Sequence, residues 1–183
     1  MRIIAGEMRG RKLKSVEGMH TRPTSDKVKG AIFNILGDKV LDAHVLDLFS
    51  GTGNLAFEAL SRGSKDAVLV EMSRDAYQVI RENIDLMGVG YKAKLLLMDA
   101  FLYINRYPDE VFDLIFLDPP YHGGLVLKAI ATLKEHTCLA TDGVIIAETA
   151  KDEEIDGDIH PFEIRKTGEY GDTKVWYLQR MDV

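Results

Sequence analysis

Apolar and polar residues follow two different periods along the chain, and these periods alternate from about residue 44 onward. Short apolar runs predict buried strands near 44–49, 67–71, 94–98, 112–117 and 143–148. Apolar residues at helical spacing between these runs predict helices near 54–62, 74–87, 100–106 and 123–135. Strands that alternate with helices in this way indicate an α/β fold with a doubly wound, mostly parallel sheet.

The pattern changes at both ends of the chain. Alternating residues in 162–166 and 173–178 predict an antiparallel hairpin that closes the sheet. Residues 2–14 are punctuated by glycine and compatible with β structure, so they predict a small β-hairpin or bent ribbon that either packs on the main domain or contacts a partner. A helix precedes the first core strand, and Thr24 or Ser25 is expected to cap it.

The length of 183 residues predicts one domain, residues 25–183, preceded by a basic extension of residues 1–24. No apolar stretch approaches the roughly 20 residues that a membrane span needs, and the start has no signal-peptide pattern, so we expect a cytoplasmic protein. A single cysteine, Cys138, excludes an internal disulfide. The five histidines lack metal-ligand spacing, so we predict no metal site.

Charge is divided unevenly along the chain, although the net charge is −6. Residues 1–39 carry nine Lys or Arg against four Asp or Glu, whereas residues 40–183 carry 14 against 25. A basic extension on an acidic body suggests contact with phosphates, although a solvated face is the alternative on charge alone. The residues expected to contact a nucleic acid are Arg9, Arg11, Lys12, Arg22 and Thr24.

A glycine turn follows the first core strand, and the chain is organised around it. Gly51 and Gly53 let the backbone turn sharply and approach a ligand, and the next helix aims free N–H groups at that ligand. Glu71 ends the second strand, 20 residues after Gly51, where a ribose-binding acid is expected. The pattern fits both NAD and S-adenosylmethionine, and Asp47, an acid inside the first strand, favours the second.

The motif Asp118-Pro119-Pro120-Tyr121 follows a buried strand and is the most specific chemical signal in the chain. Its prolines fix the backbone and leave carbonyl oxygens exposed at the carboxyl edge of the sheet. Asp118 and the Pro119 carbonyl can accept hydrogen bonds from a planar NH₂ group and hold its lone pair toward a methyl donor. Tyr121 can stack on a base that is unpaired or flipped out. The alternative is a turn that the prolines merely stiffen.

The glycine turn, the strand-end acids and the motif 118–121 together resemble a class I S-adenosylmethionine-dependent methyltransferase that acts on an exocyclic amine. The segments 6–13, 22–28 and 170–173 more narrowly resemble the RsmD family of 16S ribosomal RNA guanine-N2 methyltransferases, and the resemblance runs nearly end to end. It implies a Rossmann-like fold with a seven-stranded sheet. It also implies that the substrate is guanine in 16S rRNA of the small ribosomal subunit or its assembly intermediate.

The resemblance also implies roles for particular residues. The amino-acid part of S-adenosylmethionine would lie against Gly51 and Gly53, Glu71 would hold the ribose hydroxyls, and Asp99 would meet the adenine, although a strand-end acid is often only a helix cap. The implied cofactor-binding residues are Asp47, Phe49, Ser50, Gly51, Gly53, Glu71, Met72, Asp99 and Ala100. The implied catalytic residues are Asp118, Pro119, Pro120 and Tyr121.

Three alternative functions stay open on the sequence. An adenine-N6 methyltransferase shares the Asp-Pro-Pro-Tyr motif, but such DNA enzymes usually need a separate target-recognition region. An NAD-dependent oxidoreductase shares the glycine turn and leaves the motif at 118–121 unexplained. A non-catalytic RNA-binding assembly factor would keep the basic extension without needing an intact amine site.

Overall fold

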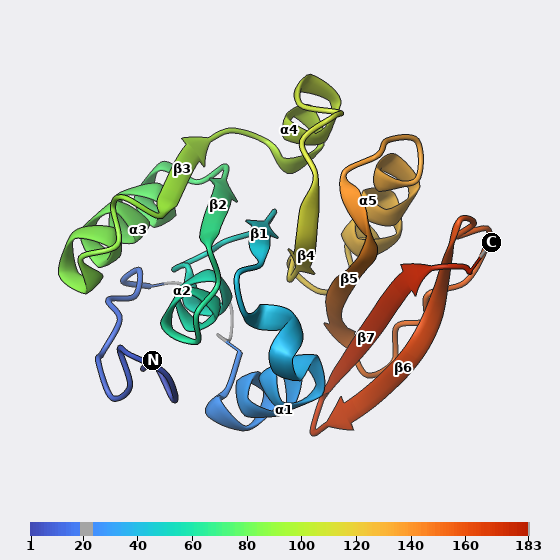
Figure 1. Cartoon of the computed structure of the whole chain (residues 1–183). Coiled ribbons are helices and arrows are strands. Elements are labelled where there is room, and N and C mark those ends of the chain that lie inside the picture. The colour runs from blue at the N-terminus through green and yellow to red at the C-terminus, as the bar shows by residue number, and fades with distance from the viewer. Residues whose placement is uncertain (19–23, 183) are drawn as a thin grey trace.

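The computed structural model describes residues 1–18 and 24–182, and its strands form one seven-stranded sheet (Figure 1). The strands are β1 (His44–Asp47), β2 (Asp66–Glu71), β3 (Ala93–Leu97), β4 (Phe112–Leu117), β5 (Leu139–Ala150), β6 (Phe162–Tyr170) and β7 (Thr173–Arg180). The helices are α1 (Asp26–Leu36), the 3₁₀ turn η1 (Gly37–Val40), α2 (Asn54–Ser61), α3 (Arg74–Met87), α4 (Ala100–Arg106) and α5 (Leu125–Leu133).

The sheet is parallel through its first five strands and antiparallel at its C-terminal edge. The strand order is β3-β2-β1-β4-β5-β7-β6, and β7 runs antiparallel to both β5 and β6. The predicted parallel core and closing hairpin are therefore confirmed. Strand order reverses between β1 and β4, which pair directly. Open α/β sheets bind ligands beyond the carboxyl ends of the strands at such a reversal, so we expect a binding site at this edge.

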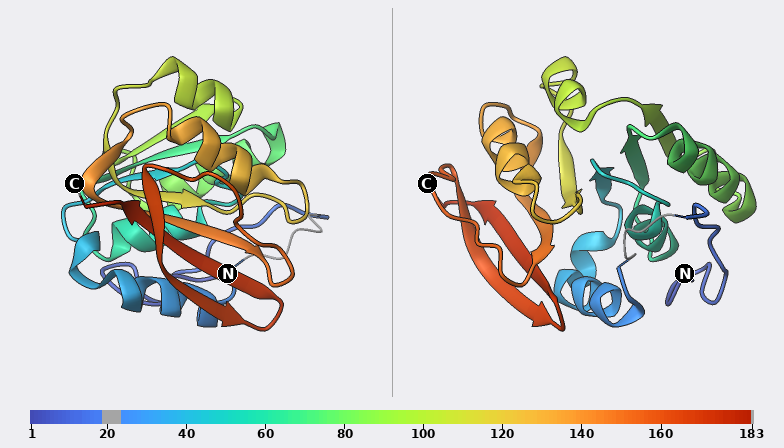
Figure 2. Two further views of the ribbon diagram at one scale, coloured as in Figure 1. Left: turned by 90° about the vertical axis from the view of Figure 1, so that its right-hand side faces the viewer. Right: turned by 180° about the vertical axis from the view of Figure 1, so that it is seen from behind.

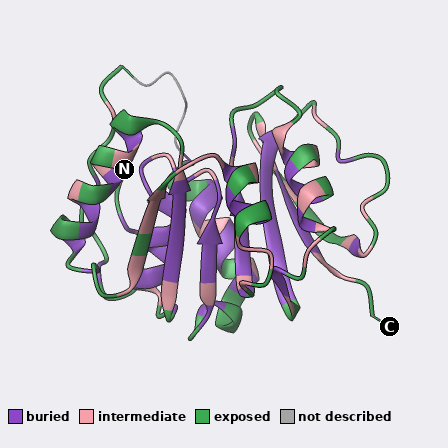
Figure 3. Ribbon diagram, turned by 90° about the horizontal axis from the view of Figure 1, so that it is seen from above, coloured by how far each residue is buried: buried purple, intermediate pink, exposed green. Residues whose placement is uncertain are grey.

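Helices cover both faces of the sheet (Figure 2). Helices α1, α2 and α3 pack on one face, and α4 and α5 pack on the other. Neighbouring residues of one strand point into opposite cores because side chains alternate across a strand: Val45 packs with the first set of helices and Leu46 with the second. The central strands β1, β2 and β4 are accordingly buried, while the edge strands β3 and β6 and the outer helix surfaces are partly exposed (Figure 3). No helix in residues 1–18 or 24–182 is long and apolar enough to cross a membrane.

Helix α1 begins after a serine N-cap and ends at a glycine. Of the two predicted caps, Ser25 is the one used, because its Oγ accepts a hydrogen bond from the Val28 amide at 3.3 Å. The helix stops at Gly37, whose φ of 53° suits a residue without Cβ. Thr24 is free of the capping role, and its side chain is buried toward the sheet instead.

The N-terminal segment packs on the main domain and contains no regular strand within residues 1–18. Its backbone folds back on itself with a single isolated antiparallel bridge between Arg2 and Lys12. The predicted β-hairpin is thus reduced to a compact turn, because three buried side chains, Ile3, Met8 and Leu13, anchor the segment to the first core. Those anchors fix the backbone where a second extended strand would have to run.

A buried ion pair attaches this segment to α1 and α2. Lys29 Nζ lies 3.3 Å from Glu58 Oε2, and both side chains are almost fully buried. The Glu58 carboxylate also accepts hydrogen bonds from the amides of Ile4 and Ala5, so the pair is well satisfied despite the cost of burying charge. Burial lowers the pKa of Lys29. Lys29 also donates to Asn54 Oδ1 at 2.7 Å, at the first residue of α2.

Candidate active site

Acidic side chains from four strands gather at the carboxyl edge of the sheet. Asp47 ends β1, Glu71 ends β2, Asp118 follows β4, and Glu148 lies near the end of β5. The four strands run parallel, so their carboxyl ends meet on one side of the molecule. Local sequence patterns fix each strand, and the topology then brings residues that are up to about a hundred positions apart to one place.

The predicted glycine turn connects β1 to α2 and is held by its own backbone. The Ser50 amide donates to Val70 O at 3.1 Å, and Gly53 N donates to Ser50 O at 2.7 Å. Gly51 and Gly53 have φ values of 59° and 83°, a region that L side chains rarely adopt. A Cβ on Gly53 would lie 2.3 Å from Phe57 Cε2, whereas a Cβ on Gly51 would meet open space. Gly51 therefore leaves room above the turn, and Gly53 lets the helix pack beneath it.

Glu71 lies beside the glycine turn, as the sequence predicted, and stabilises it through hydrogen bonds. Its Oε2 accepts a hydrogen bond from the Gly51 amide at 2.7 Å, and its Oε1 accepts from Met72 N at 3.1 Å and Ser73 N at 3.0 Å. The carboxylate thus joins the first and second strand ends. Whether Glu71 also holds ribose hydroxyls is a prediction that these contacts leave untested.

Asp47 is a buried acid with an unused acceptor. The residue is 2% exposed, and its Oδ1 has no hydrogen-bond partner among the described residues. Burial, together with the charge of nearby Glu71, raises the pKa of Asp47 to about 7, although the backbone amides of Phe49 and Ala56 partly offset the rise. A buried carboxylate without a cation costs free energy unless a partner arrives. A ligand with an ammonium group would supply such a partner.

The remaining predicted cofactor residues lie around the ends of β2 and β3. Met72 is 69% exposed, Ala100 is buried, and the Phe49 ring meets Phe101 edge-on with centroids 6.1 Å apart. Asp99 caps α4, since its Oδ1 accepts from the amides of Phe101 and Leu102 at 2.9 and 3.0 Å. A contact between Asp99 and adenine stays a prediction.

The motif at 118–121 forms a network with a residue from far upstream. Thr24 Oγ1 lies 3.0 Å from Asp118 Oδ2 and 2.8 Å from Glu148 Oε2. A hydroxyl has one proton to donate, so full pairing needs a second proton on one of the two carboxyls. Burial and the Glu148 charge raise the pKa of Asp118 well above its ordinary value, and burial also raises the pKa of Glu148. Both shifts favour a proton shared between Asp118 and Glu148.

Tyr121 is held by its hydroxyl rather than by packing of its ring. The hydroxyl donates to Glu148 Oε1 at 2.7 Å and lies 2.9 Å from Thr173 Oγ1. Burial raises the pKa of Tyr121 above its usual range. The residue is 37% exposed, so these hydrogen bonds fix the hydroxyl while part of the side chain is accessible to solvent. Of the two prolines, Pro119 is buried and Pro120 exposed.

Glu148 and Thr173 complete the site, and the sequence analysis missed both. Glu148 follows an apolar run, which is the same signal that identified Glu71 at the end of β2. Thr173 lies in the segment 170–173 that carried the family resemblance, but only the β6–β7 turn brings it to Tyr121. Thr24 was expected to contact nucleic acid, and the structure places it between Asp118 and Glu148.

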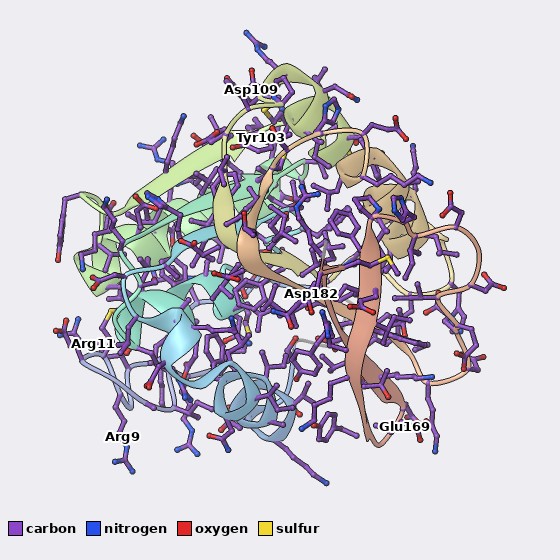
Figure 4. The ribbon with its side chains drawn as sticks, turned by 45° about the vertical axis from the view of Figure 1, so that its right-hand side comes forward. Arg9, Arg11, Tyr103, Asp109, Glu169 and Asp182 are labelled. Carbon is purple, nitrogen blue, oxygen red and sulfur yellow. The ribbon has the colours of Figure 1, made fainter. Side chains whose placement is uncertain are left out.

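The expected RNA-contacting residues are spread over two regions. Arg9, Arg11 and Lys12 are exposed on the N-terminal segment, and the side chain of Arg9 points away from the domain (Figure 4). Arg11 Nη1 lies 3.5 Å from Met87 O, which holds part of that side chain against α3. Arg22 lies outside the described residues. These basic groups are therefore available on the surface beside α3.

Comparison with known proteins agrees with this geometry. The family model described as "Conserved hypothetical protein 95" matches residues 1–179. "Putative rRNA methyltransferase YlbH" of Bacillus subtilis is 36% identical over 96% of both chains, and "Ribosomal RNA small subunit methyltransferase D" of Haemophilus influenzae is 36% identical over 83% of this chain and 80% of its own. The solved structure "Putative methyltransferase yhhF from Escherichia coli" has a TM-score of 0.85 at 32% identity and covers 98% of this chain and 97% of its own.

The Rossmann-like α/β sheet with its glycine turn, together with the likeness to known methyltransferases, identifies the chain as an S-adenosylmethionine-dependent methyltransferase. The relatives narrow this class further. The chain belongs to the RsmD/YlbH family of S-adenosylmethionine-dependent rRNA methyltransferases.

Proposed function

We propose that this enzyme transfers a methyl group from S-adenosylmethionine to the exocyclic N2 amine of a guanine in 16S rRNA of the small ribosomal subunit. The observation that carries the proposal is the position of Asp118 and Tyr121, at the switch point beside the glycine turn. Two relatives with 36% and 35% identity are named small-subunit rRNA methyltransferases, which supports the choice of RNA. The particular base rests on this family likeness.

The residues at the ends of β1 and β2 would hold the methyl donor. Asp47 would offer its unused oxygen to the amino group, Gly51 would leave space for the amino-acid part, and Glu71 would accept from the ribose. S-adenosylmethionine supplies a methyl group that its sulfonium already activates, so the protein needs mainly to orient the amine.

The residues of the substrate half would prepare the amine. The lone pair of an exocyclic amine is delocalised into the ring, which makes the amine a poor nucleophile. Hydrogen bonds from its N–H groups to Asp118 and to the Pro119 carbonyl would turn the lone pair toward the methyl group. The Tyr121 ring would stack on the extruded base. The Asp118–Glu148 pair is the nearest acceptor for the proton that the product amine releases.

The basic N-terminal segment would supply affinity for RNA. Arg9, Arg11 and Lys12 are exposed, and phosphate contacts position a protein on RNA without reading its sequence. We assign Arg22 and Thr24 to the same substrate side, and residues 1–24 to an RNA-binding extension of the methyltransferase domain 25–183. The partner would be the small ribosomal subunit or its assembly intermediate.

The test is methyl transfer from labelled S-adenosylmethionine to three substrates: small subunits that lack the modification, naked 16S RNA and duplex DNA, each followed by nucleoside analysis. N2-methylguanosine at one position in the particle is the expected product. N6-methyladenine in RNA or DNA would keep the fold and mechanism but overturn the substrate. Binding of RNA without any transfer would instead indicate an assembly factor.

A further inference from the structure

A small cavity opens directly beside the amine-binding motif. It has a volume of about 130 Å³ and lies between the start of α1, the end of β5 and the β6–β7 turn. Its polar lining includes Thr24, Tyr121, Glu148 and Thr173. All four side chains, together with Asp118, belong to the hydrogen-bond network already described, so the cavity adjoins the motif 118–121.

Glu148 is the acid that lines this cavity. The residue is 5% exposed, and its two oxygens accept from the Thr24 and Tyr121 hydroxyls at 2.8 and 2.7 Å. Each carboxylate oxygen has a second lone pair, so both retain the capacity to accept from a ligand. The charge is balanced by hydroxyl dipoles rather than by a cation at these contacts. Such a carboxylate strongly favours a ligand that brings a donor.

The bases that carry an exocyclic amine differ at the neighbouring ring atom. In guanine, N1 beside the N2 amine carries a hydrogen and is a donor. In adenine and cytosine, the ring nitrogen beside the amine has a lone pair and is an acceptor. A carboxylate facing that atom therefore attracts guanine and repels the other two, whereas the Asp-Pro-Pro-Tyr motif alone accepts any of the three amines.

We propose that Glu148 determines base specificity by accepting a hydrogen bond from N1–H of the target guanine while Asp118 accepts from its N2 amine. Asp118 and Glu148 flank one hydroxyl, that of Thr24, at 3.0 and 2.8 Å, so their acceptors are adjacent. Adjacent acceptors match the adjacent donors N1–H and N2–H of one ring edge. This inference rests on the proposed function, because it needs a guanine as substrate.

The β6–β7 turn would keep the acceptor in place. Gly171 has a φ of 59°, which allows the tight reversal that brings Thr173 to 2.9 Å from the Tyr121 hydroxyl. That contact orients the Tyr121 proton toward Glu148, and the same hydroxyl therefore links the stacking ring to the base-reading acid. The segment 170–173, singled out in the sequence, gains a role in this way.

The test compares guanine with 2-aminopurine at the methylated position of 16S RNA, which is joined from two fragments and assembled into small subunits. 2-Aminopurine keeps the N2 amine but has an unprotonated N1 and no O6. Wild-type enzyme is expected to prefer guanine by about 10²-fold or more in kcat/KM, because sites built to bind an N–H reject analogues without it. In Glu148→Gln, an amide can donate to the bare N1, and the preference is expected to fall at least tenfold.

The change in this preference isolates the contact to N1, since loss of O6 affects both enzymes alike. Glu169→Gln is the matched control: Glu169 is an exposed acid of β6, 3.6 Å from Lys151, and should keep the wild-type preference (Figure 4). Calorimetric binding of S-adenosylmethionine and the thermal unfolding midpoint check that Glu148→Gln is folded.

The outcomes separate the two proposals. If wild-type enzyme forms N2-methylguanosine but Glu148→Gln keeps the full preference for guanine, the role of Glu148 is overturned and the proposed function stands. If the variant fails to fold, equal methylation of guanine and 2-aminopurine by wild-type enzyme overturns the role by itself. If wild-type enzyme leaves guanine unmodified, both proposals fall.

Discussion

Asp47→Asn tests whether ionisation of Asp47, the buried acid beneath the glycine turn, destabilises the folded protein. The pKa of Asp47 is about 7 in the folded protein, whereas its ordinary value, which applies to the unfolded chain, is 3.8. At 1.36 kcal/mol per unit, this difference corresponds to about 4 kcal/mol of unfolding free energy. Because the folded pKa is raised, this contribution is fully present below pH 3.8 and is lost as the pH rises to about 7.

The variant removes the ionisation and keeps the shape of the side chain. Between pH 5 and pH 8 the wild type should therefore lose about 3 kcal/mol of stability that Asp47→Asn does not lose. Other buried acids such as Asp118 titrate in both proteins, so the difference between the two curves reports Asp47 together with its charge interactions with Asp118 and Glu71. Urea unfolding at several pH values measures it, as a divergence of about 1–3 M between the two midpoints.

Asp109→Asn is a suitable control, because Asp109 is an exposed acid after α4, and its curve should run parallel to that of the wild type (Figure 4). Parallel curves for Asp47→Asn as well would refute the reasoning, since they would mean that Asp47 ionises without penalty in the folded state. The same variant should bind S-adenosylmethionine with an affinity that is independent of pH from 5 to 8. Wild-type affinity should rise with pH over that range, because the cation favours ionised Asp47.

Three further variants test the assigned roles. Asp118→Ala should abolish turnover and leave the affinity for S-adenosylmethionine within a few-fold, and a loss of cofactor binding would make Asp118 a structural residue. Glu71→Ala should weaken cofactor binding by about 1.5–3 kcal/mol in calorimetry, the usual scale for hydrogen bonds to a charged group, and an unchanged affinity would remove Glu71 from the site. Replacement of Arg9, Arg11 and Lys12 together by Gln should weaken RNA binding and flatten its salt dependence by about 0.7–0.9 per lost phosphate contact, whereas an unaltered slope would leave these charges as a solvated face.

The sequence by itself determined the features that depend on neighbouring residues. The alternation of strands and helices, the glycine turn at 51–53, the place of Glu71 beside it and the position of the motif 118–121 after a buried strand all arise from periodicity, backbone freedom and chain direction. Ser73 and Gly88 bound α3 for the same local reason. The carboxyl ends of parallel strands all lie at one edge of the sheet. An acid that follows such a strand can therefore be assigned to that edge without knowledge of the packing.

Only the tertiary structure decided the contacts between distant segments. Thr24 and Glu148 are separated by 124 positions, and their hydrogen bond exists because α1 packs beside the end of β5. The N-terminal segment packs on the domain instead of forming a hairpin, because the Glu58 carboxylate, more than 50 positions away, accepts hydrogen bonds from its backbone amides. No local period encodes such pairings. Burial then raised the pKa of Asp118, since a pKa depends on every group that surrounds the carboxyl.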